Sequence, residues 1–373
     1  MKNVTGALGA LAMTATAAAA GGIDRSGQPI GVIFEKGNYG ELSFGLINPN
    51  VSGSDVAAFG GRDTGSVAGN HNLPGIALKY DLSKSLSVAV IYDQAYGADI
   101  EYPSAAAGGS VALGGTQAHV DSAGVTALLR YKFDENFSVH GGIRATKAEA
   151  DVTLAGLAYG GLNGYNVTFD RDWGVGYVIG GAYERPDIAL RVAITYFSKI
   201  KHEFDTTEYV GATAVLASRT EVNTPQAINL DFQTGVAANT LVFGSIRWVD
   251  WSKFTIDPTW FTPRAGGGLV ALEDTTTYTL GVGRKFNDHW SGSVFVTYEP
   301  KGDPLVSPLA PTNGYKGIGV AAVYTQDNVK VTLGARYLDL GDAQPETGTP
   351  DTARADMTGN HAVAVGVKVG FTF

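Results

Sequence analysis

The last thirteen residues, from His361 to Phe373, alternate between apolar side chains and small or polar ones. The apolar set comprises Val363, Val365, Val367, Val369, Phe371 and Phe373. Between them stand Ala362, Ala364, Gly366, Lys368, Gly370 and Thr372. A period of two places each set on its own face of a β-strand. Because this pattern recurs from about residue 40 to the end of the chain, the sequence predicts a transmembrane β-barrel with lipid outside and a polar interior.

The composition agrees with a barrel and excludes several other classes of protein. After residue 20 the chain has no apolar run long enough to cross a bilayer as a helix. A barrel accounts for this, because only every second residue of a spanning strand needs to be apolar. The absence of cysteine excludes disulfides, thiolate metal sites and a cysteine nucleophile. The net charge of -9 argues against nucleic acid as a partner.

The N-terminus has the pattern of a secretory signal peptide. Lys2 is followed by an apolar or small stretch, Val4 to Ala15, and then by residues 16–20, which end in alanines. We predict a signal peptide at residues 1–20, which places the mature chain outside the cytoplasm. Residues 21–39 are predicted to form a short N-terminal hatch or plug, with an ordered tail as the alternative. The barrel is predicted at residues 40–373.

The alternation predicts 14 strands separated alternately by short turns and long loops. The predicted strands are 40–50, 73–81, 86–98, 119–133, 137–150, 164–184, 187–203, 226–237, 240–254, 275–286, 289–301, 315–325, 328–340 and 359–373. Short periplasmic turns and long outer loops are typical of outer-membrane barrels. Aromatic residues at strand ends, among them Tyr92 with Tyr96 and Trp248 with Trp251, are interpreted as interface girdles.

The same alternation assigns the charged residues of the strands to the lumen. The predicted lumen bases are Arg130, Lys132, His140, Arg144, Arg191, Arg247, Lys285, Lys330, Arg336 and Lys368, and the acids include Asp93 and Glu299. One interpretation is structural, with bases and acids paired to hold the barrel's shape. The other is that some bases bind a ligand carboxylate through charge-assisted hydrogen bonds. Arg144 and Arg191 are the candidates for that role, because both lie mid-strand on nearby strands.

The predicted outer loops contain apolar residues that suggest a binding surface. They include Leu216 in the fourth loop and Trp260, Phe261 and Leu269 in the fifth. Exposed apolar patches usually mark binding sites, so these four residues are candidates for the capture of a hydrophobic ligand. The alternative is that the loops pack against one another as a cap.

No pattern of catalytic residues is present in the sequence. There is no Gly-x-Ser-x-Gly elbow, no His-Glu-x-x-His motif and no phosphate-binding loop. The 6 histidines have no metal-ligand spacing. We therefore expect no enzyme activity, no metal and no cofactor.

The order of its segments gives the chain a resemblance to the FadL family. The carrying segments are Phe44 to Gly53, Leu86 to Tyr102, Phe243 to Phe254, Trp290 to Pro304 and the final strand pair. The resemblance implies a fourteen-stranded outer-membrane channel for long-chain fatty acids or aromatic hydrocarbons. It also implies lateral release through a kink in the third strand, where Gly97 is the candidate. Family members carry a longer hatch with an Asn-Pro-Ala motif, which this chain lacks.

We therefore expect passive uptake of hydrophobic compounds, most of all long-chain fatty acids, across the bacterial outer membrane. The expected partners are outer-membrane lipid and a hydrophobic small molecule, and the expected state is a monomer. Two alternatives are a general solute porin, which would conduct ions, and a structural or adhesion barrel, whose loss would leave hydrocarbon use unchanged.

Overall fold

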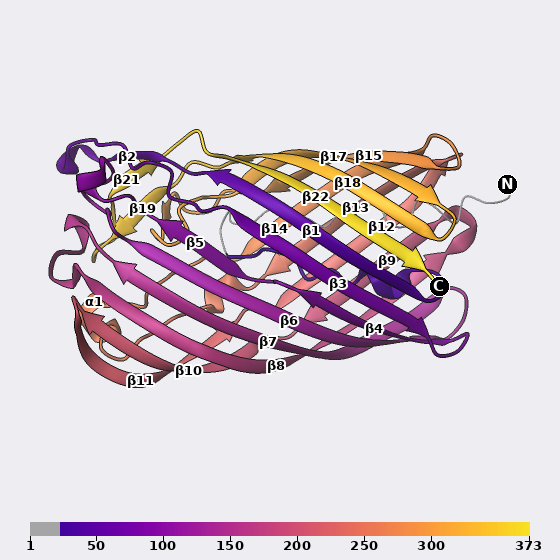
Figure 1. Ribbon diagram of the computed structural model, residues 1–373, viewed down its shortest axis with the longest axis horizontal. Helices are drawn as coiled ribbons and strands as arrows, with labels where there is room; N and C mark the ends of the chain where they lie inside the picture. Colours follow the sequence, from indigo (N-terminus) through magenta and orange to yellow (C-terminus); the bar gives the residue numbers. More distant parts are fainter. Residues whose placement is uncertain (1–22) are drawn as a thin grey trace.

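The computed structural model describes residues 23–373, which form one closed β-barrel (Figure 1). Within this range the main sheet contains 17 hydrogen-bonded segments that make 14 antiparallel strands, because the third, seventh and eighth strands each consist of two segments. The barrel closes where β1 pairs with β22 along its whole length. In the described residues no helix has both the length and the apolar character to cross a membrane. The predicted signal peptide lies outside the described residues.

The strands follow the predicted order closely. The first six are β1 (Tyr39–Asn50), β3 (His71–Asp81), β4 (Leu86–Asp93) with β5 (Gly97–Glu101), β6 (Gln117–Lys132), β7 (Phe137–Leu154) and β8 (Tyr165–Arg185). The next four are β9 (Leu190–Phe197) with β10 (Ile200–Val210), β11 (Thr213–Thr224) with β12 (Ala227–Ala237), β13 (Thr240–Val249) and β14 (Thr275–Lys285). The last four are β15 (Trp290–Glu299), β17 (Tyr315–Gln326), β18 (Val329–Leu340) and β22 (His361–Thr372).

Short elements occupy the connections. The 3-10 helices are η1 (Gly31–Phe34), η2 (Ala57–Phe59), η3 (Ala105–Ala107), η4 (Leu157–Leu162), η5 (Pro186–Ile188) and η6 (Trp251–Lys253), and α1 (Thr262–Ala265) is a single helical turn. The loop strands are β2 (Gly53–Asp55), β16 (Leu305–Val306), β19 (Gln344–Thr347), β20 (Thr352–Ala353) and β21 (Ala355–Met357). Pairing of β2 with β21, and of β16 and β20 with β19, joins the outer loops into a cap.

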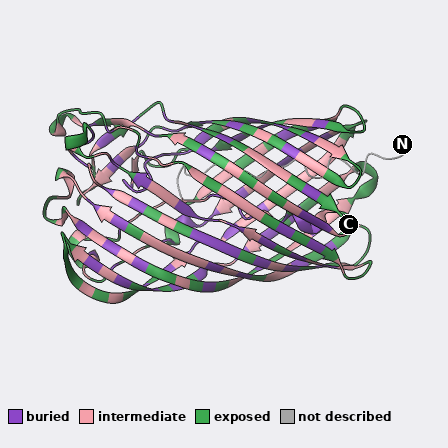
Figure 2. Cartoon of the chain, viewed as in Figure 1, coloured by how far each residue is buried: buried purple, intermediate pink, exposed green. Residues whose placement is uncertain are grey.

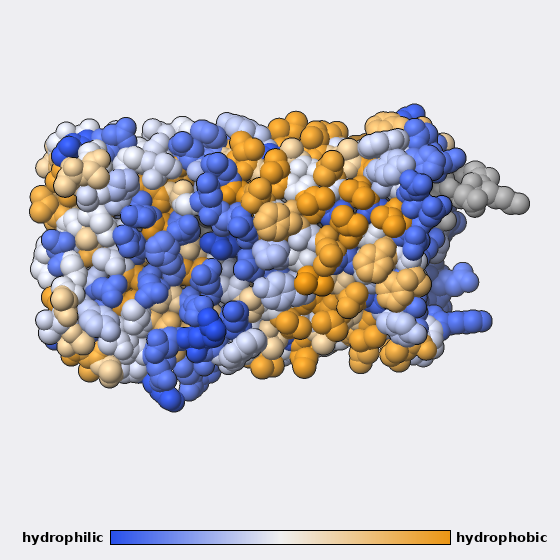
Figure 3. Space-filling view, in the orientation of Figure 1, coloured by the Kyte–Doolittle hydropathy of each residue, from blue (hydrophilic) through white to orange (hydrophobic). Residues whose placement is uncertain are grey.

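Burial alternates along the strands as a barrel requires (Figure 2). On β22, Val363 and Val365 are exposed on the outside, whereas Ala362 and Ala364 are buried. Exposed apolar side chains form a broad band over the half of the barrel that carries the tight turns (Figure 3). The other half is largely polar outside, so the barrel extends beyond the bilayer on the side of the long loops. All the predicted lumen bases lie on the inward face of the barrel. Each is two residues from a buried residue of the same strand, and residues two apart on a strand share a face.

The largest error in the strand prediction concerns residues 204–225, which were expected to form a loop. They are β10 and β11, which form a hairpin that turns at residues 211–212. The period of two is present there, with Phe204, Thr206 and Glu208 buried on alternate positions. The outward positions are polar because this hairpin stands above the apolar band, and so the expected apolar face is missing.

Two predicted girdle residues, Tyr96 and Trp251, are buried inside instead. Their rings meet edge to face with centroids 5.6 Å apart, and Tyr96 is 5% exposed. Tyr96 lies within the interruption of the third strand and Trp251 begins η6, so neither continues the alternation of its strand.

The N-terminal segment, residues 23–38, lies inside the barrel. Arg247 of β13 pairs with Asp24 at 2.6 Å, and Asn229 of β12 donates to the Gly27 carbonyl at 3.0 Å. Further along, Ile30, Val32 and Ile33 are buried. These contacts hold the segment across the lumen before it turns into β1.

Candidate ligand-binding cavity

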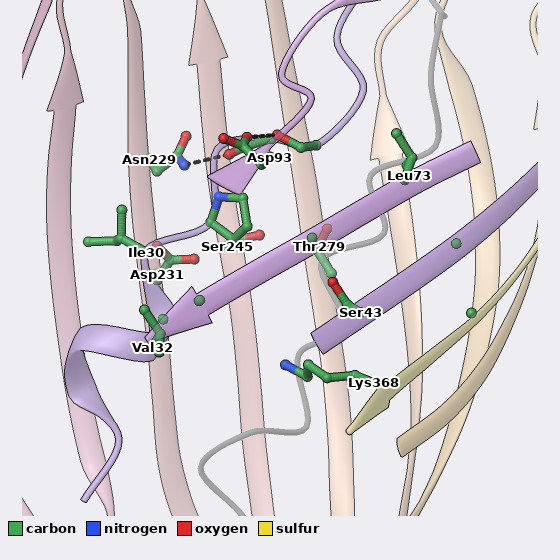
Figure 4. A pocket seen from close by; sticks show the side chains of 18 of the residues that line it. Ile30, Val32, Ser43, Leu73, Asp93, Asn229, Asp231, Ser245, Thr279 and Lys368 are labelled. Atoms are coloured by element: carbon green, nitrogen blue, oxygen red, sulfur yellow. Dashed lines mark hydrogen bonds between the residues drawn. The ribbon is translucent and has the colours of Figure 1, made fainter. Parts of the chain in front are cut away.

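A cavity of about 260 Å³ lies in the lumen between the N-terminal segment and the barrel wall. Figure 4 shows Ile30 and Val32 of the segment on one side, with Ser43 and Lys368 on strands across from them. The volume lies near the lower end of the roughly 300–1,000 Å³ typical of ligand pockets. The cavity is therefore large enough to bind a small molecule or part of a longer one.

Small inward residues on three adjacent strands create this space. Gly45 of β1 lies directly opposite Gly366 of β22, and Ser43 of β1 lies opposite Gly75 of β3. All four residues line the cavity. Their lack of bulk leaves open the volume that larger side chains fill elsewhere, because protein interiors are otherwise close-packed.

The lining combines apolar and polar side chains. Its apolar part includes Ile30, Val32, Leu73, Phe243 and Phe295. Its polar part includes Asn229, Asp231, Gln233, Ser245, Thr279 and Thr297. The lining can therefore contact both the apolar and the polar parts of an amphipathic ligand.

Arg191, one of the two predicted carboxylate-binding residues, lines the cavity. Its Nη2 donates to Gln233 Oε1 at 3.1 Å, and its Cζ lies 4.7 Å from the centre of the Phe34 ring. Among residues 23–373, no carboxylate comes within 4.0 Å of its guanidinium. Glu35 and Asp231 belong to the same lining but lie beyond that distance. Arg191 therefore retains charge and donors that could bind an anion.

Arg144, the other predicted residue, is outside the cavity lining. Its Nη1 lies 2.7 Å from Asp93 Oδ1 and donates to Thr126 Oγ1 at 2.7 Å. Asp93 also accepts a hydrogen bond from Ser26 of the N-terminal segment. Arg144 thus holds the wall and the segment together, as the structural interpretation of the lumen charges proposed.

The third strand is interrupted between Asp93 and Gly97, where a kink was expected. The N-terminal segment occupies this interruption: Arg25 N donates to the Ala95 carbonyl at 2.7 Å, and Gly97 N donates to the Ile23 carbonyl at 2.9 Å. A β-carbon on Gly97 would lie 2.3 Å from Arg25 Cζ, so a larger residue there would displace the Arg25 side chain. Burial lowers the pKa of Arg25, while the carboxylates of Asp121 and Asp99 act in the opposite direction.

The four predicted loop residues belong to the cap or its rim. Phe261 and Leu269 are buried, and the Trp260 ring stacks on Tyr165 at a centroid distance of 5.9 Å. Glu208 anchors this loop by accepting from the backbone N–H groups of Trp260 and Phe261 at 2.8 and 2.9 Å. Leu216 is half-buried on β11. None of these four residues lines the cavity described above.

Comparison with known proteins identifies the family. The model of the outer membrane protein transport protein family (OMPP1/FadL/TodX) matches residues 3–373. The chain belongs to this family. It is therefore a non-enzymatic channel for hydrophobic compounds in the bacterial outer membrane.

Solved structures of the FadL/TodX family share the fold of this chain. A FadL homologue of Pseudomonas aeruginosa has a TM-score of 0.72 at 14% identity, with 92% of each chain covered. The toluene transporter TodX of P. putida has a TM-score of 0.65 at 13% identity, with 92% of each chain covered. The toluene transporter TbuX of Ralstonia pickettii has a TM-score of 0.63 at 14% identity, with 100% of each chain covered. No curated protein matches the sequence.

Two residues that contact Arg191 were not predicted from the sequence of this family member. Phe34 stands in the predicted plug, where no pattern links it to Arg191, 157 residues further along the chain. Gln233 stands on the lumen face of β12. The alternation predicts that face, but it does not predict the contact with Arg191. The small inward residues, by contrast, gave a signal, since the inward face of the last strand carries alanine and glycine at Ala362, Ala364 and Gly366.

Proposed function

We propose that this channel takes up long-chain fatty acids and that Arg191 binds the carboxylate. The observation that supports this most directly is a cavity-lining guanidinium with no carboxylate at ion-pair distance in the described chain. A buried or half-buried cation favours an anionic partner, and its hydrogen bonds to a charged acceptor are about twice as strong as neutral ones. A fatty acid supplies that anion together with an apolar chain for Ile30, Val32 and Leu73.

The polar lining favours a fatty acid over a plain hydrocarbon. Toluene or an alkane offers no acceptor for Arg191 and no polar partner for Ser245 or Thr279, which line the same cavity. Burying such groups against an apolar ligand costs about 1–3 kcal/mol for each unsatisfied group. The acid keeps at least the guanidinium satisfied, and so we rank it first.

We further propose that the ligand leaves laterally beside the third strand. The cavity lining includes Gly75 and Ile76 on β3 and Tyr92 and Gln94 at the end of β4, which lie where the interruption begins. The register of β3 with β4 stops at the pair Ile76 and Tyr92. Entry of the ligand would require the loop cap around Trp260 and Phe261 to move. In this proposal the mature channel has lost the signal peptide of residues 1–20, and residues 21–39 form its plug.

The first test is equilibrium binding of radiolabelled palmitate to the purified, detergent-folded protein and to Arg191→Gln. We expect saturable binding that weakens about tenfold or more in the variant, as for a lost charge-assisted bond of about 1.5–3 kcal/mol. Hexadecanol, which has the same chain without the charge, should bind both proteins similarly. Arg219→Gln is the matched control, since its side chain is 71% exposed in the outer hairpin.

The outcomes separate the possible functions. Saturable palmitate binding that is unchanged in Arg191→Gln would keep the channel but remove Arg191 as the carboxylate site. Binding of toluene in place of palmitate would assign an aromatic hydrocarbon substrate. Ion conductance in planar bilayers, with no saturable binding, would assign a porin.

A cross-link tests the lateral route. Because the chain has no cysteine, Pro74→Cys and Gln94→Cys can be joined by a short thiol-reactive linker across the interruption. We expect the linked protein to bind palmitate but to lose its transfer into liposomes. A control linker between Val294→Cys and Val320→Cys joins two residues already paired in the ladder of β15 and β17, and should leave transfer intact. Transfer that continues through the Pro74–Gln94 linker would exclude this exit.

A further inference from the structure

Phe34, the last residue of η1, lies against two lumen guanidinium groups. Arg130 Cζ is 4.6 Å and Arg191 Cζ is 4.7 Å from the centre of its ring. The His140 ring meets Phe34 edge to face at 88°, with centroids 5.8 Å apart. Such distances place both cations within the range of cation–π attraction, which extends to about 6 Å. The plug is thus joined at this point to β6, β7 and β9.

The two arginines differ in how their charge is balanced. Arg130 pairs with Glu184 and donates from Nε to Ser138 Oγ at 3.1 Å. Arg191 donates to the neutral amide of Gln233 and, within residues 23–373, has no carboxylate at ion-pair distance. Glu35 and Asp231 line the same cavity but lie beyond ion-pair distance of Arg191. Arg130 is therefore held by a carboxylate, whereas Arg191 keeps donors that an anionic ligand could use.

We propose that Phe34 is a positioning residue that orients Arg191 for a carboxylate. This inference rests on the proposed function of Arg191. A guanidinium is planar and directs all five N–H donors within its plane. Attraction between its face and an aromatic ring restrains that plane without using a donor. One donor is then used by Gln233, and the others stay available to acceptors in the plane, which is the geometry that a carboxylate matches.

The consequence is that ligand selectivity depends on the plug. Phe34 belongs to the N-terminal segment, whereas Arg191 and Gln233 belong to β9 and β12. With the segment in place, Arg191 is held in one orientation and the channel prefers an acid. With the ring removed, the guanidinium gains rotational freedom, and this entropy must be lost again when the acid binds.

The test compares an acid with its neutral counterpart in Phe34→Leu and Phe34→Tyr. For each protein we would measure the Kd of palmitate and of hexadecanol at pH 8, where the acid is ionised. We expect Phe34→Leu to weaken palmitate binding about threefold to tenfold, the size of a cation–π contact, with hexadecanol changed less than about twofold. Phe34→Tyr keeps an aromatic face and should restore the preference. Phe137→Leu, at a lipid-facing position that is 54% exposed, is the matched control.

Three results would be decisive. Equal weakening of palmitate and hexadecanol in Phe34→Leu would mean that the ring only fills space, and unchanged binding of both would remove its role. Failure of Phe34→Tyr to restore selectivity would exclude the aromatic face as the cause. Arg191→Gln separates the two proposals. If it leaves palmitate binding unchanged, the proposed carboxylate site is wrong. If it removes the preference for palmitate over hexadecanol and Phe34→Leu does not, only the role of Phe34 is wrong.

Discussion

Arg144 and Arg191 are the same residue type on the same face of the same barrel, yet their surroundings differ. Arg144 is 3% exposed, forms an ion pair with Asp93 and donates to Thr126. Arg191 faces a cavity and contacts a neutral amide and an aromatic ring. The comparison shows that a lumen position does not by itself decide whether an arginine is held by a carboxylate. The residues on the neighbouring strands decide it.

The strand between Arg144 and its partner explains the difference. Arg144 of β7 reaches over Gly124 of β6 to Asp93, which is paired with Gly124 at the end of β4. A β-carbon on Gly124 would lie 2.5 Å from Arg144 Nη2. Glycine therefore opens the path to the carboxylate. Around Arg191, Gln233 on the adjacent strand lies directly opposite and offers only an amide.

The largest effect is expected for Arg144→Ala. Removing one member of a buried ion pair leaves the other charge uncompensated, which costs about 3–5 kcal/mol. The free energy of unfolding should fall by that amount in urea titrations of the protein folded into bilayers. In a double-mutant cycle, adding Asp93→Ala should recover a large part of the loss. A loss below about 1 kcal/mol in Arg144→Ala would mean that the pair does not stabilise the barrel.

Gly124→Ala should have the next largest effect. The added methyl group would displace the Arg144 guanidinium from Asp93, and overpacking of this kind typically costs about 1–3 kcal/mol. The same unfolding titration measures it. Gly31→Ala is the matched control, because a β-carbon at Gly31 would have open space around it. Gly319→Ala would not serve, because Phe295 covers that glycine. Equal stability of Gly124→Ala and wild type would show that Arg144 reaches Asp93 by another path.

The sequence predicted the barrel and the face of each lumen charge, because a period of two has a direct structural meaning. It did not predict the different partners of Arg144 and Arg191, because partners depend on strand register and on the interruption after Asp93. The N-terminal segment gave the least information: Phe34 contacts Arg191 through the lumen, and no periodicity relates a plug to a wall. The outer hairpin was missed because its outward face lies above the bilayer and is polar, so the apolar face expected of a spanning strand is absent.

Arg191→Gln should change stability less than either substitution near Arg144. No carboxylate in residues 23–373 is left unpaired by its removal, and the remaining loss is a cation–π contact of about 0.5–2 kcal/mol. We expect the unfolding free energy to fall by about 1 kcal/mol while palmitate binding falls tenfold or more. A stability loss as large as that of Arg144→Ala would contradict the comparison, because it would mean that Arg191 also stabilises the barrel wall.

The smallest effect is expected for Arg219→Ala. Arg219 Nε lies 3.0 Å from Asp205, but the two side chains are 71% and 69% exposed in the outer hairpin. Water solvates both ions before and after the pair is broken, so exposed pairs contribute only about 0–1 kcal/mol. Any loss should shrink further when salt is added, because exposed charges are screened over about 10 Å at 0.1 M. A loss of 3 kcal/mol here would show that arginine substitutions destabilise this barrel whatever their partners, and the contrast between Arg144 and Arg191 would then lose its explanation.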